Sequence, residues 1–350
     1  MDTTQRDRTV GFLCLEVTAF GWALPEPAVL RGGAATRLVL RRQGQAFEAR
    51  LDGRLGGSEL EGRVVMSEGR RPFVDAELAS PALETALLGL AYDVLAARLG
   101  LPPGRPWQWP GIWPRTPLDW SWLQDVDLRL DLAAAALRQR GVTLPGANAV
   151  LGLREGRLSV KGLSLPIAGG TLAGSLSLEH AAAHVLLGAD LRLTGARAES
   201  LVEALAPGSG LVGELGLGAR LLGSGRSIAD LVGTLQGEGE VSLRRGRLGG
   251  IAFPPLEGGE AALDPGLTIE RLEGPLSIRG GVVASAGPGL ALDFPSGTAE
   301  AHLRLDLLAW LTELELKGHL EDAPASSFEL RLIGAPGRLR AVPPLEPARP

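Results

Sequence analysis

Apolar and polar residues alternate along much of this chain, which is the pattern of a β-strand with one buried face. The apolar positions of one such segment are Val126, Leu128, Leu130 and Leu132, and acidic or basic residues stand between them. The same period of two recurs at 189–194, 299–307, 314–320 and 328–332. Successive side chains of a strand point to opposite faces, so each segment predicts one apolar and one polar face. Strands buried on both faces would read as continuous apolar runs, so the pattern favours an antiparallel sheet.

Glycines punctuate these segments at a spacing typical of hairpin turns in an all-β domain. We expect turns at a set of glycines: Gly156, Gly162, Gly169, Gly170, Gly188, Gly195, Gly237, Gly246, Gly249 and Gly250. Glu155–Gly156 is predicted to be a hairpin turn with positive φ angles. Gly170 and Gly174 are predicted to be turn or bulge positions.

Three helices are predicted between the strands. The first opens at Ser80–Pro81, a good N-cap followed by proline at the first helical position, and runs to Gly100 with Leu83 on its apolar face. The second spans about 198–205. The third follows Ser227, because the spacing of Ser227 to Asp230 resembles a capping box.

A segment rich in proline and tryptophan separates two parts of the chain. Prolines between 101 and 118 remove backbone donors and restrict the preceding residues, so neither a helix nor a strand ladder is expected there. We therefore predict an N-terminal β-repeat at 1–100, a linker at 101–118, a second β-domain at 119–340 and a Pro-rich tail at 341–350. The predicted fold class is mainly β: an elongated, strongly curved antiparallel sheet, similar to a repeating β-groove, with a few short helices.

Composition narrows the possible functions. The net charge of −5 provides no basic field for nucleic acid, and a single cysteine, Cys14, excludes an intramolecular disulfide. No apolar run reaches the length of about 18 residues that a transmembrane helix needs. The stretch 10–24 is short, contains Glu16 and lacks a convincing cleavage site, so we expect no signal peptide within these 350 residues.

The chain from Pro117 onward resembles the C-terminal region of the AsmA family. The resemblance rests on the order and spacing of five stretches: PLDWSWLQDVDLRL at 117–130, LREGRLSV at 153–160, GGTLAGSLSL at 169–178, GSGRSIADLVGTLQG at 223–237 and RRGRLGGI at 244–251. It covers about 135 residues, and its pieces are turns, strands and a capped helix rather than a catalytic motif.

This resemblance implies a non-enzymatic protein of the Gram-negative envelope. Family members place a curved β-sheet in the periplasm, carry an inner-membrane helix that is not visible in this chain, and support outer-membrane biogenesis and membrane assembly. Their sheet is similar to the groove of lipid transporters. The implied partners are phospholipid acyl chains or another envelope lipid, together with envelope proteins, and no cofactor or metal is implied.

The alternation places a row of apolar side chains where such a groove would hold acyl chains. The candidate groove residues are Val126, Leu128, Leu130, Leu132, Leu172, Leu176, Leu191, Leu193, Leu215, Leu217, Val241, Leu243, Leu303 and Leu305. Burial of each methylene contributes about 0.8 kcal/mol, so apolar contact alone can hold a lipid tail. The alternative is that these leucines pack against one another and that the protein is a scaffold modulating outer-membrane protein assembly without binding lipid.

Five of the seven tryptophans lie within sixteen positions of the chain: Trp107, Trp109, Trp113, Trp120 and Trp122. The first three are candidates for contact with a membrane interface, where indole rings are enriched. Stacking on envelope polysaccharide is a second interpretation. A third is a plug that closes one end of the sheet and protects its edge.

Three other patterns are candidate sites of chemistry. His180 and His184 have the spacing of a helical metal pair but fall at a predicted hairpin tip. The stretch 223–227 resembles a phosphate loop without its lysine. The aspartates at 125, 127 and 131 could be paired carboxylates, yet they occupy the polar face of one strand. We interpret all three as structural features.

Overall fold

The computed structural model describes residues 28–32, 36–43, 46–55, 58–67, 69–86, 113–139, 142–181, 184–205, 210–249, 267–320, 323–336 and 338–342. Over these residues the protein is mainly β with two short α-helices, which confirms the predicted fold class. None of the helices in the described ranges is long and apolar enough to cross a membrane. The stretch 10–24, most of the predicted helix to Gly100, Trp107, Trp109 and the tail from 343 lie outside the described residues.

The chain divides into two compact units, Met1–Leu95 with Ser121–Val160 and Ala96–Trp120 with Lys161–Pro350. The domain boundaries predicted from the sequence, at 100, 118 and 340, are not tested by this division and stay a prediction. The elements of the first unit are β1 (Ala28–Gly32), β2 (Thr36–Gln43), β3 (Ala46–Leu55), β4 (Ser58–Ser67), β5 (Phe73–Ser80), β6 (Leu83–Glu84), the 3-10 helix η2 (Ser121–Gln124), β7 (Asp127–Gln139) and β8 (Val142–Arg154). Strands β1 to β5 each pair with the next in antiparallel fashion, as do β7 and β8.

The first unit corrects two predictions. Strands β5 and β6 pair with β7 in parallel, so the sheet is mixed rather than wholly antiparallel. Alternation reports which face is buried but not the direction of a strand, and the connection from 85 to 126 is long enough for a crossover. Leu83, expected on a helix, pairs with Leu137 in this parallel ladder and is 4 % exposed.

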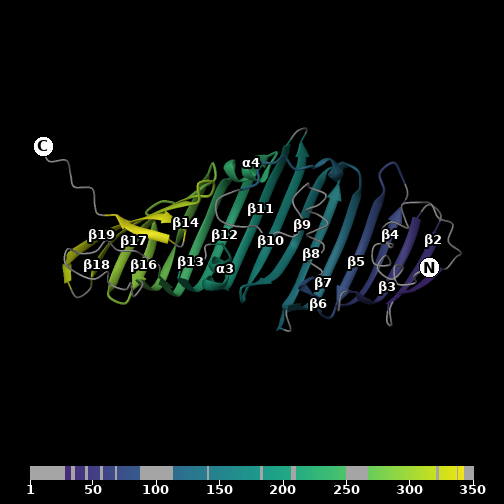
Figure 1. Ribbon diagram of the computed structural model, residues 1–350, viewed down its shortest axis with the longest axis horizontal. Helices are drawn as coiled ribbons and strands as arrows, with labels where there is room; N and C mark the ends of the chain where they lie inside the picture. The colour runs from purple at the N-terminus through teal and green to yellow at the C-terminus, as the bar shows by residue number, and fades with distance from the viewer. Residues whose placement is uncertain are drawn as a thin grey trace, which may run out of the picture. The chain divides into compact units, whose positions relative to one another are not determined.

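Strand β9 (Arg157–Ile167) contains the boundary between the units, and the second unit continues from it. Its further elements are β10 (Gly170–Ala181), β11 (His184–Arg197), α3 (Ala198–Leu205), β12 (Leu211–Gly225), α4 (Ile228–Gly233), β13 (Gln236–Leu248), β14 (Leu267–Arg279), β15 (Val282–Ser285), β16 (Leu290–Phe294), β17 (Gly297–Asp306), β18 (Leu311–Leu320), β19 (Ala323–Ala335) and β20 (Arg338–Val342). From β10 to β14 and from β17 to β20, each strand pairs antiparallel with the next one in the chain (Figure 1). Strands β15 and β16 each pair with both β14 and β17, so they share the place between them.

Many glycines predicted to form turns lie inside strands. Glu155–Gly156 does form a hairpin turn with positive φ at both residues, as predicted. Gly174, by contrast, lies within β10 at φ 146°, and its pairing with β11 shows no register shift, so it is not a bulge. A Cβ atom at Gly174 would overlap the carbonyl oxygen of Asp190, and one at Gly237 would overlap that of Arg220. These strands are longer than expected because glycine bends them instead of ending them.

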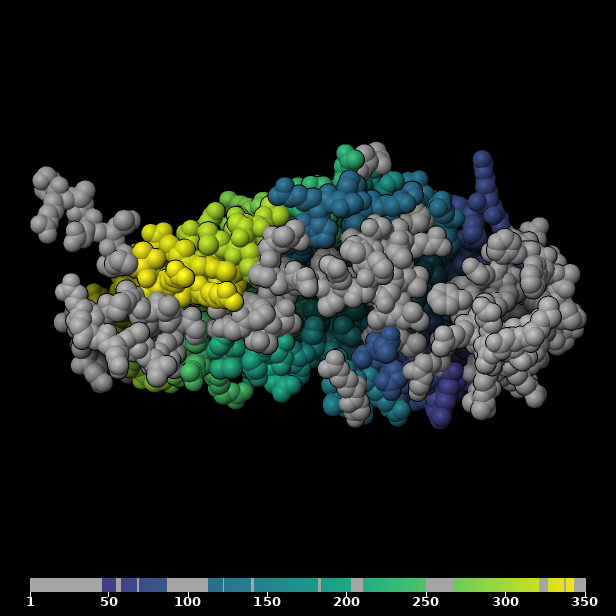
Figure 2. Space-filling model, viewed as in Figure 1, coloured from purple at the N-terminus to yellow at the C-terminus, as the bar shows by residue number. Residues whose placement is uncertain are grey.

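The bends curl the sheet of the second unit onto its apolar side. Leu215, Leu243 and Leu316 are at most 8 % exposed and belong to one core cluster. Leu248, at the end of β13, packs against that core and also against Leu332 and Leu339 of β19 and β20. Five strands, β14 to β18, stand between β13 and β19 in chain order, so this contact shows the curl (Figure 1). In Figure 2 the yellow residues near the C-terminus lie beside yellow-green residues of the same unit.

Helix α4 begins with the predicted capping box. The hydroxyl oxygen of Ser227 accepts a hydrogen bond from the Asp230 backbone N–H at 3.1 Å, and the Asp230 carboxylate accepts from the backbone N–H of Ser227 at 3.0 Å. The carboxylate also accepts from the Arg226 N–H at 3.1 Å. The hydrogen bonds with the Ser227 side chain and with these N–H groups hold the pKa of Asp230 below its ordinary value.

We expect Gly174→Val to lower the free energy of unfolding by about 2–4 kcal/mol, because its side chain would meet the Asp190 backbone. Gly162→Asn is the matched control: Gly162 has φ 57° with open space at its Cβ position, and asparagine tolerates this conformation. Urea unfolding followed by circular dichroism measures both. Equal stability of the two variants would contradict the role of Gly174.

We expect Asp230→Asn to lower the urea midpoint at pH 7 and to do so less in acid. A carboxyl whose pKa is lowered by folding stabilises the protein above its ordinary pKa of about 4, and this contribution is lost as the pH falls through the lower folded value. The gap between the wild-type and variant midpoints should therefore narrow below about pH 4. A gap that stays constant from pH 7 to pH 2.5 would show that ionised Asp230 does not stabilise the cap.

Candidate functional site

A row of apolar side chains crosses four neighbouring strands of the second unit. Leu172 of β10 pairs with Leu193 of β11, Leu193 pairs with Leu217 of β12, and Leu217 pairs with Val241 of β13. Paired residues of adjacent strands point to the same face, so these four side chains form one line, here called the leucine row. At a strand spacing of about 4.8 Å the row spans roughly 14 Å.

The same face carries other predicted groove residues and some that the sequence analysis missed. Leu191 pairs with Ala219, and Leu176 pairs with Ala189, which in turn pairs with Leu221. Leu221 was missed although it continues the alternation of β12, because glycines at 216, 218 and 223 interrupt that pattern.

Exposure divides this face into an open and a closed part. Leu217 is 39 % exposed, and Leu172, Leu191 and Val241 are half-buried. Leu193, which lies between Leu172 and Leu217 in the leucine row, is 7 % exposed, and Val241 packs against the closed core. Leu215 and Leu243, predicted as groove residues, are 8 % and 4 % exposed and belong to the closed core. Exposed and buried groove residues can be close in sequence, as Leu217 and Leu215 are. What separates them is the curl of the sheet over β13 to β18, which covers only part of the apolar face.

Helices cover both ends of β12 on this face. Ala198 and Leu201 of α3 pack in the core cluster beside Leu215. At the other end, a Cβ at Gly225 would lie 2.6 Å from the Leu231 backbone nitrogen of α4, so only glycine lets this helix approach the strand. The accessible stretch of β12 on the apolar face is therefore its middle, around Leu217.

The remaining groove candidates lie on other strands. Leu128, Leu130 and Leu132 pair with apolar residues of β5 in the first unit and form an apolar face there; Val126 directly precedes β7. Leu303 and Leu305 are half-buried on β17, where Leu303 packs against the closed core. The structure thus distributes the predicted groove residues over at least three settings rather than one.

Trp113 is half-buried, and its indole N–H donates a hydrogen bond to the carbonyl oxygen of Leu307 at 2.7 Å. Nearby, the Leu118 N–H donates to the Arg226 carbonyl at 2.8 Å, and the Ala229 N–H donates to the Pro114 carbonyl at 3.1 Å. The segment 113–118 is therefore tied to α4 and to the turn after β17. This placement agrees with the plug interpretation of Trp113.

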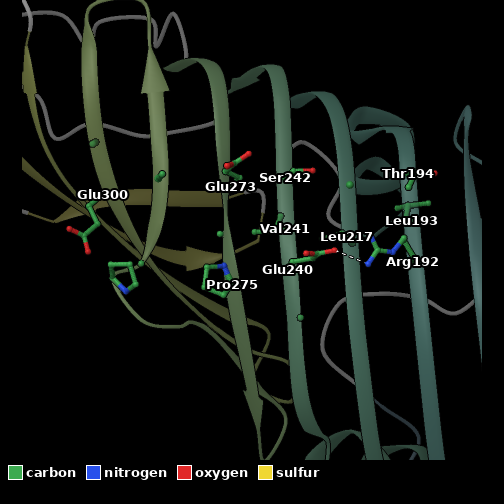
Figure 3. A pocket seen from close by; sticks show the side chains of 17 residues that line it. Arg192, Leu193, Thr194, Leu217, Glu240, Val241, Ser242, Glu273, Pro275 and Glu300 are labelled. Carbon is green, nitrogen blue, oxygen red and sulfur yellow. Dashed lines mark ion pairs between the residues drawn. The ribbon is translucent and has the colours of Figure 1, made fainter.

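The opposite face of these strands is polar. A hollow of about 910 Å³ is lined by residues of both faces, among them Arg192 and Glu240 of the polar face and Leu193 and Leu217 of the leucine row. Arg192 and Glu240 point toward one another across β12 and form an ion pair of 3.1 Å (Figure 3). Gly218 stands between them in the register and leaves room for the pair. Glu273, also in the lining, is paired with Arg271, which lowers the pKa of the carboxyl. Each of these charges thus has an oppositely charged neighbour: Arg192 pairs with Glu240, and Glu273 pairs with Arg271.

The other patterns that were weighed for chemistry have structural roles. His180 pairs with Val185, so His184 points to the opposite face and the two histidines cannot share a metal ion. The Asp127 carboxylate accepts from the Glu155 N–H at 3.0 Å and steadies the hairpin, while Asp131 pairs with Arg129. Over the described residues, no group of three potential ligands is placed to hold a metal ion.

Comparison with known families agrees with the resemblance predicted from the sequence. Residues 111–254 match the model of the AsmA family, a region that runs from the Trp113 segment through β13 and includes the leucine row. No curated protein and no solved structure matches the chain. AsmA proteins are associated with the bacterial envelope and are not known as enzymes, so the match indicates a role in envelope biogenesis. The chain thus contains an AsmA-family region at residues 111–254.

Proposed function

We propose that this protein is a non-enzymatic envelope factor that shields or transfers lipid acyl chains along the apolar face of its second unit. The observation that carries the proposal is the leucine row, four apolar side chains in register on β10 to β13, with Leu217 39 % exposed at its centre. A periplasmic location beside the inner membrane and support of outer-membrane assembly are parts of the same proposal.

The chemistry of the row suits an acyl chain. Its described members are aliphatic, so they provide contact without a polar group that an alkyl chain would leave unsatisfied. Burial of each methylene contributes about 0.8 kcal/mol, so even six methylenes over a row of roughly 14 Å would contribute about 5 kcal/mol. Side chains of similar size on successive strands also give a lipid tail nearly equal positions, which permits movement across the strands.

A scaffold without bound lipid is the second candidate, and the closed core favours it. Leu290, Leu292 and Leu316 are 2 % exposed, so on β16 and β18 the apolar side chains satisfy one another. Such a unit would act through its surface, for example by restraining an outer-membrane protein during assembly. The two candidates differ in whether the open stretch around Leu217 is occupied.

The test compares lipids that co-purify with the wild type and with Leu217→Asp after expression in a Gram-negative host. We expect native mass spectrometry to show phospholipid on the wild type and at least about fivefold less on the variant, because a carboxylate in an apolar contact carries a large desolvation cost. Since Leu217 is already partly exposed, the variant should keep its β-sheet circular dichroism signal.

Leu222→Asp is the matched control. Leu222 lies on the same strand, points to the opposite face and is 68 % exposed. It should retain the lipid of the wild type. A wild-type protein that is folded and empty would overturn the lipid proposal and leave the scaffold in front. Equal loss in both variants would show that the lipid is not held at the leucine row.

A further inference from the structure

The turn between β17 and β18 presents apolar side chains where a turn is ordinarily polar. Its sequence from Asp306 is Asp-Leu-Leu-Ala-Trp-Leu. Leu308 is 41 % exposed, Leu311 is 39 % exposed and Ala309 is exposed. Turns favour Gly, Pro, Asn, Asp and Ser for reasons of backbone conformation and hydrogen bonding. Three large apolar residues within four positions therefore need another explanation.

This apolar turn, residues 307–311, is held in place on several sides. The Asp306 carboxylate accepts hydrogen bonds from the backbone N–H groups of Leu308 at 2.9 Å and Ala309 at 2.8 Å. The Leu307 N–H donates to the Gly281 carbonyl at 2.9 Å, and the Leu307 carbonyl accepts from the Trp113 indole at 2.7 Å. The backbone of the turn is thus fixed, and Leu308 and Leu311 stay partly exposed in it, although the Leu308 side chain also lies beside Gly233 of α4.

Trp310 adds a second, independent signal. Its φ angle is +52°, in the left-handed region that a bulky side chain rarely adopts. Such a conformation costs of the order of 1–3 kcal/mol and persists where the surrounding structure imposes it. Its indole is half-buried with a buried Nε1 atom, whereas Leu308 and Leu311, two positions before it and one after it in the sequence, stay exposed. A strained backbone conformation that leaves leucines exposed to solvent indicates a surface that contacts an apolar partner.

We propose that the apolar turn is a membrane contact, and that Leu308 and Leu311 insert into a lipid surface. Exposed aliphatic side chains on a fixed turn supply the apolar area that such a surface buries. A stable protein partner would need roughly 800 Å² from each side, more than a five-residue turn presents. A lipid surface needs no such complementary shape.

The membrane contact does not depend on lipid binding at the leucine row. Leu308 lies at the end of β17 and Leu217 in the middle of β12, so the two can be changed separately. If both hold, the turn would bring the protein to a bilayer while the row takes up acyl chains. The membrane contact is measured by binding to vesicles and the leucine row by co-purified lipid, and a change at one site should not alter the measurement for the other.

The experiment is flotation of the purified full chain with phosphatidylcholine vesicles. We expect the wild type to float with the vesicles, and the bound fraction of Leu308→Ser/Leu311→Ser to fall at least about fivefold because two inserted side chains are lost. Because the contact is apolar, neither 0.5 M salt nor added phosphatidylglycerol should change it by more than about twofold. Lipid found by native mass spectrometry on the variant should remain at the wild-type level.

Leu222→Ser is the matched control, since Leu222 is 68 % exposed, more than either turn leucine, and lies on β12 rather than in the apolar turn. It should float like the wild type. The proposal would be overturned if the turn variant floated as well as the wild type, or if Leu222→Ser lost as much vesicle binding as the turn variant.

A second measurement covers the case in which the double variant does not fold. In a Cys14→Ser background, Ala309→Cys is labelled with an environment-sensitive fluorophore. Insertion predicts a blue shift of its emission when phosphatidylcholine vesicles are added, whereas the same label at Leu222→Cys should not shift. An unshifted label at 309 would overturn the membrane contact.

Discussion

At several points in this sheet a main-chain carbonyl oxygen occupies the space that a side chain would take. The carbonyls of Asp190, Arg220 and His319 fill the Cβ positions of Gly174, Gly237 and Gly297 on the adjacent strands. Glycine alone permits such an approach, and each one lets its strand bend without losing its ladder. A sheet of long strands that bend in this way can curl over its own apolar side. The contact of Leu248 with Leu332 and Leu339 is the result of that curl.

Because the sheet curls, the same alternation of apolar and polar residues forms a closed core on some strands and an open apolar face on others. On β16 and β18 apolar side chains meet across the curl and form a core, as the 2 % exposure of Leu292 and Leu316 shows. On β10 to β12 the described residues cover the apolar side chains only in part, and Leu217 stays 39 % exposed. The polar face needs no such partner, because charges such as Arg192 and Glu240 pair across the strands and stay in solvent. The function proposed here belongs to the part of the face that the curl leaves open.

Sequence alone predicts which face each side chain occupies but not how far that face is covered. Alternation correctly places Leu172, Leu193 and Leu217 on one side, because the side-chain period of a strand is two regardless of context. The capped helix at Ser227 was equally local and equally predictable. Glycine spacing misled, since a bend within a strand and a turn between strands demand the same residue. The parallel pairing of β5 with β7 and the closure over Leu243 depend on segments far apart in the chain, which no local pattern reports.

Hydrogen bonds at one end of the strands link the parts that matter for both proposals. The Leu235 carbonyl of the loop after α4 accepts from the Gly281 N–H, and the Gly281 carbonyl accepts from the Leu307 N–H. Leu307 also binds the Trp113 indole. This chain of contacts joins the helix that closes the apolar face to the turn that exposes Leu308. Trp113 thus acts as a brace: its indole donates to the Leu307 carbonyl and helps to fix the turn in which Leu308 stays exposed.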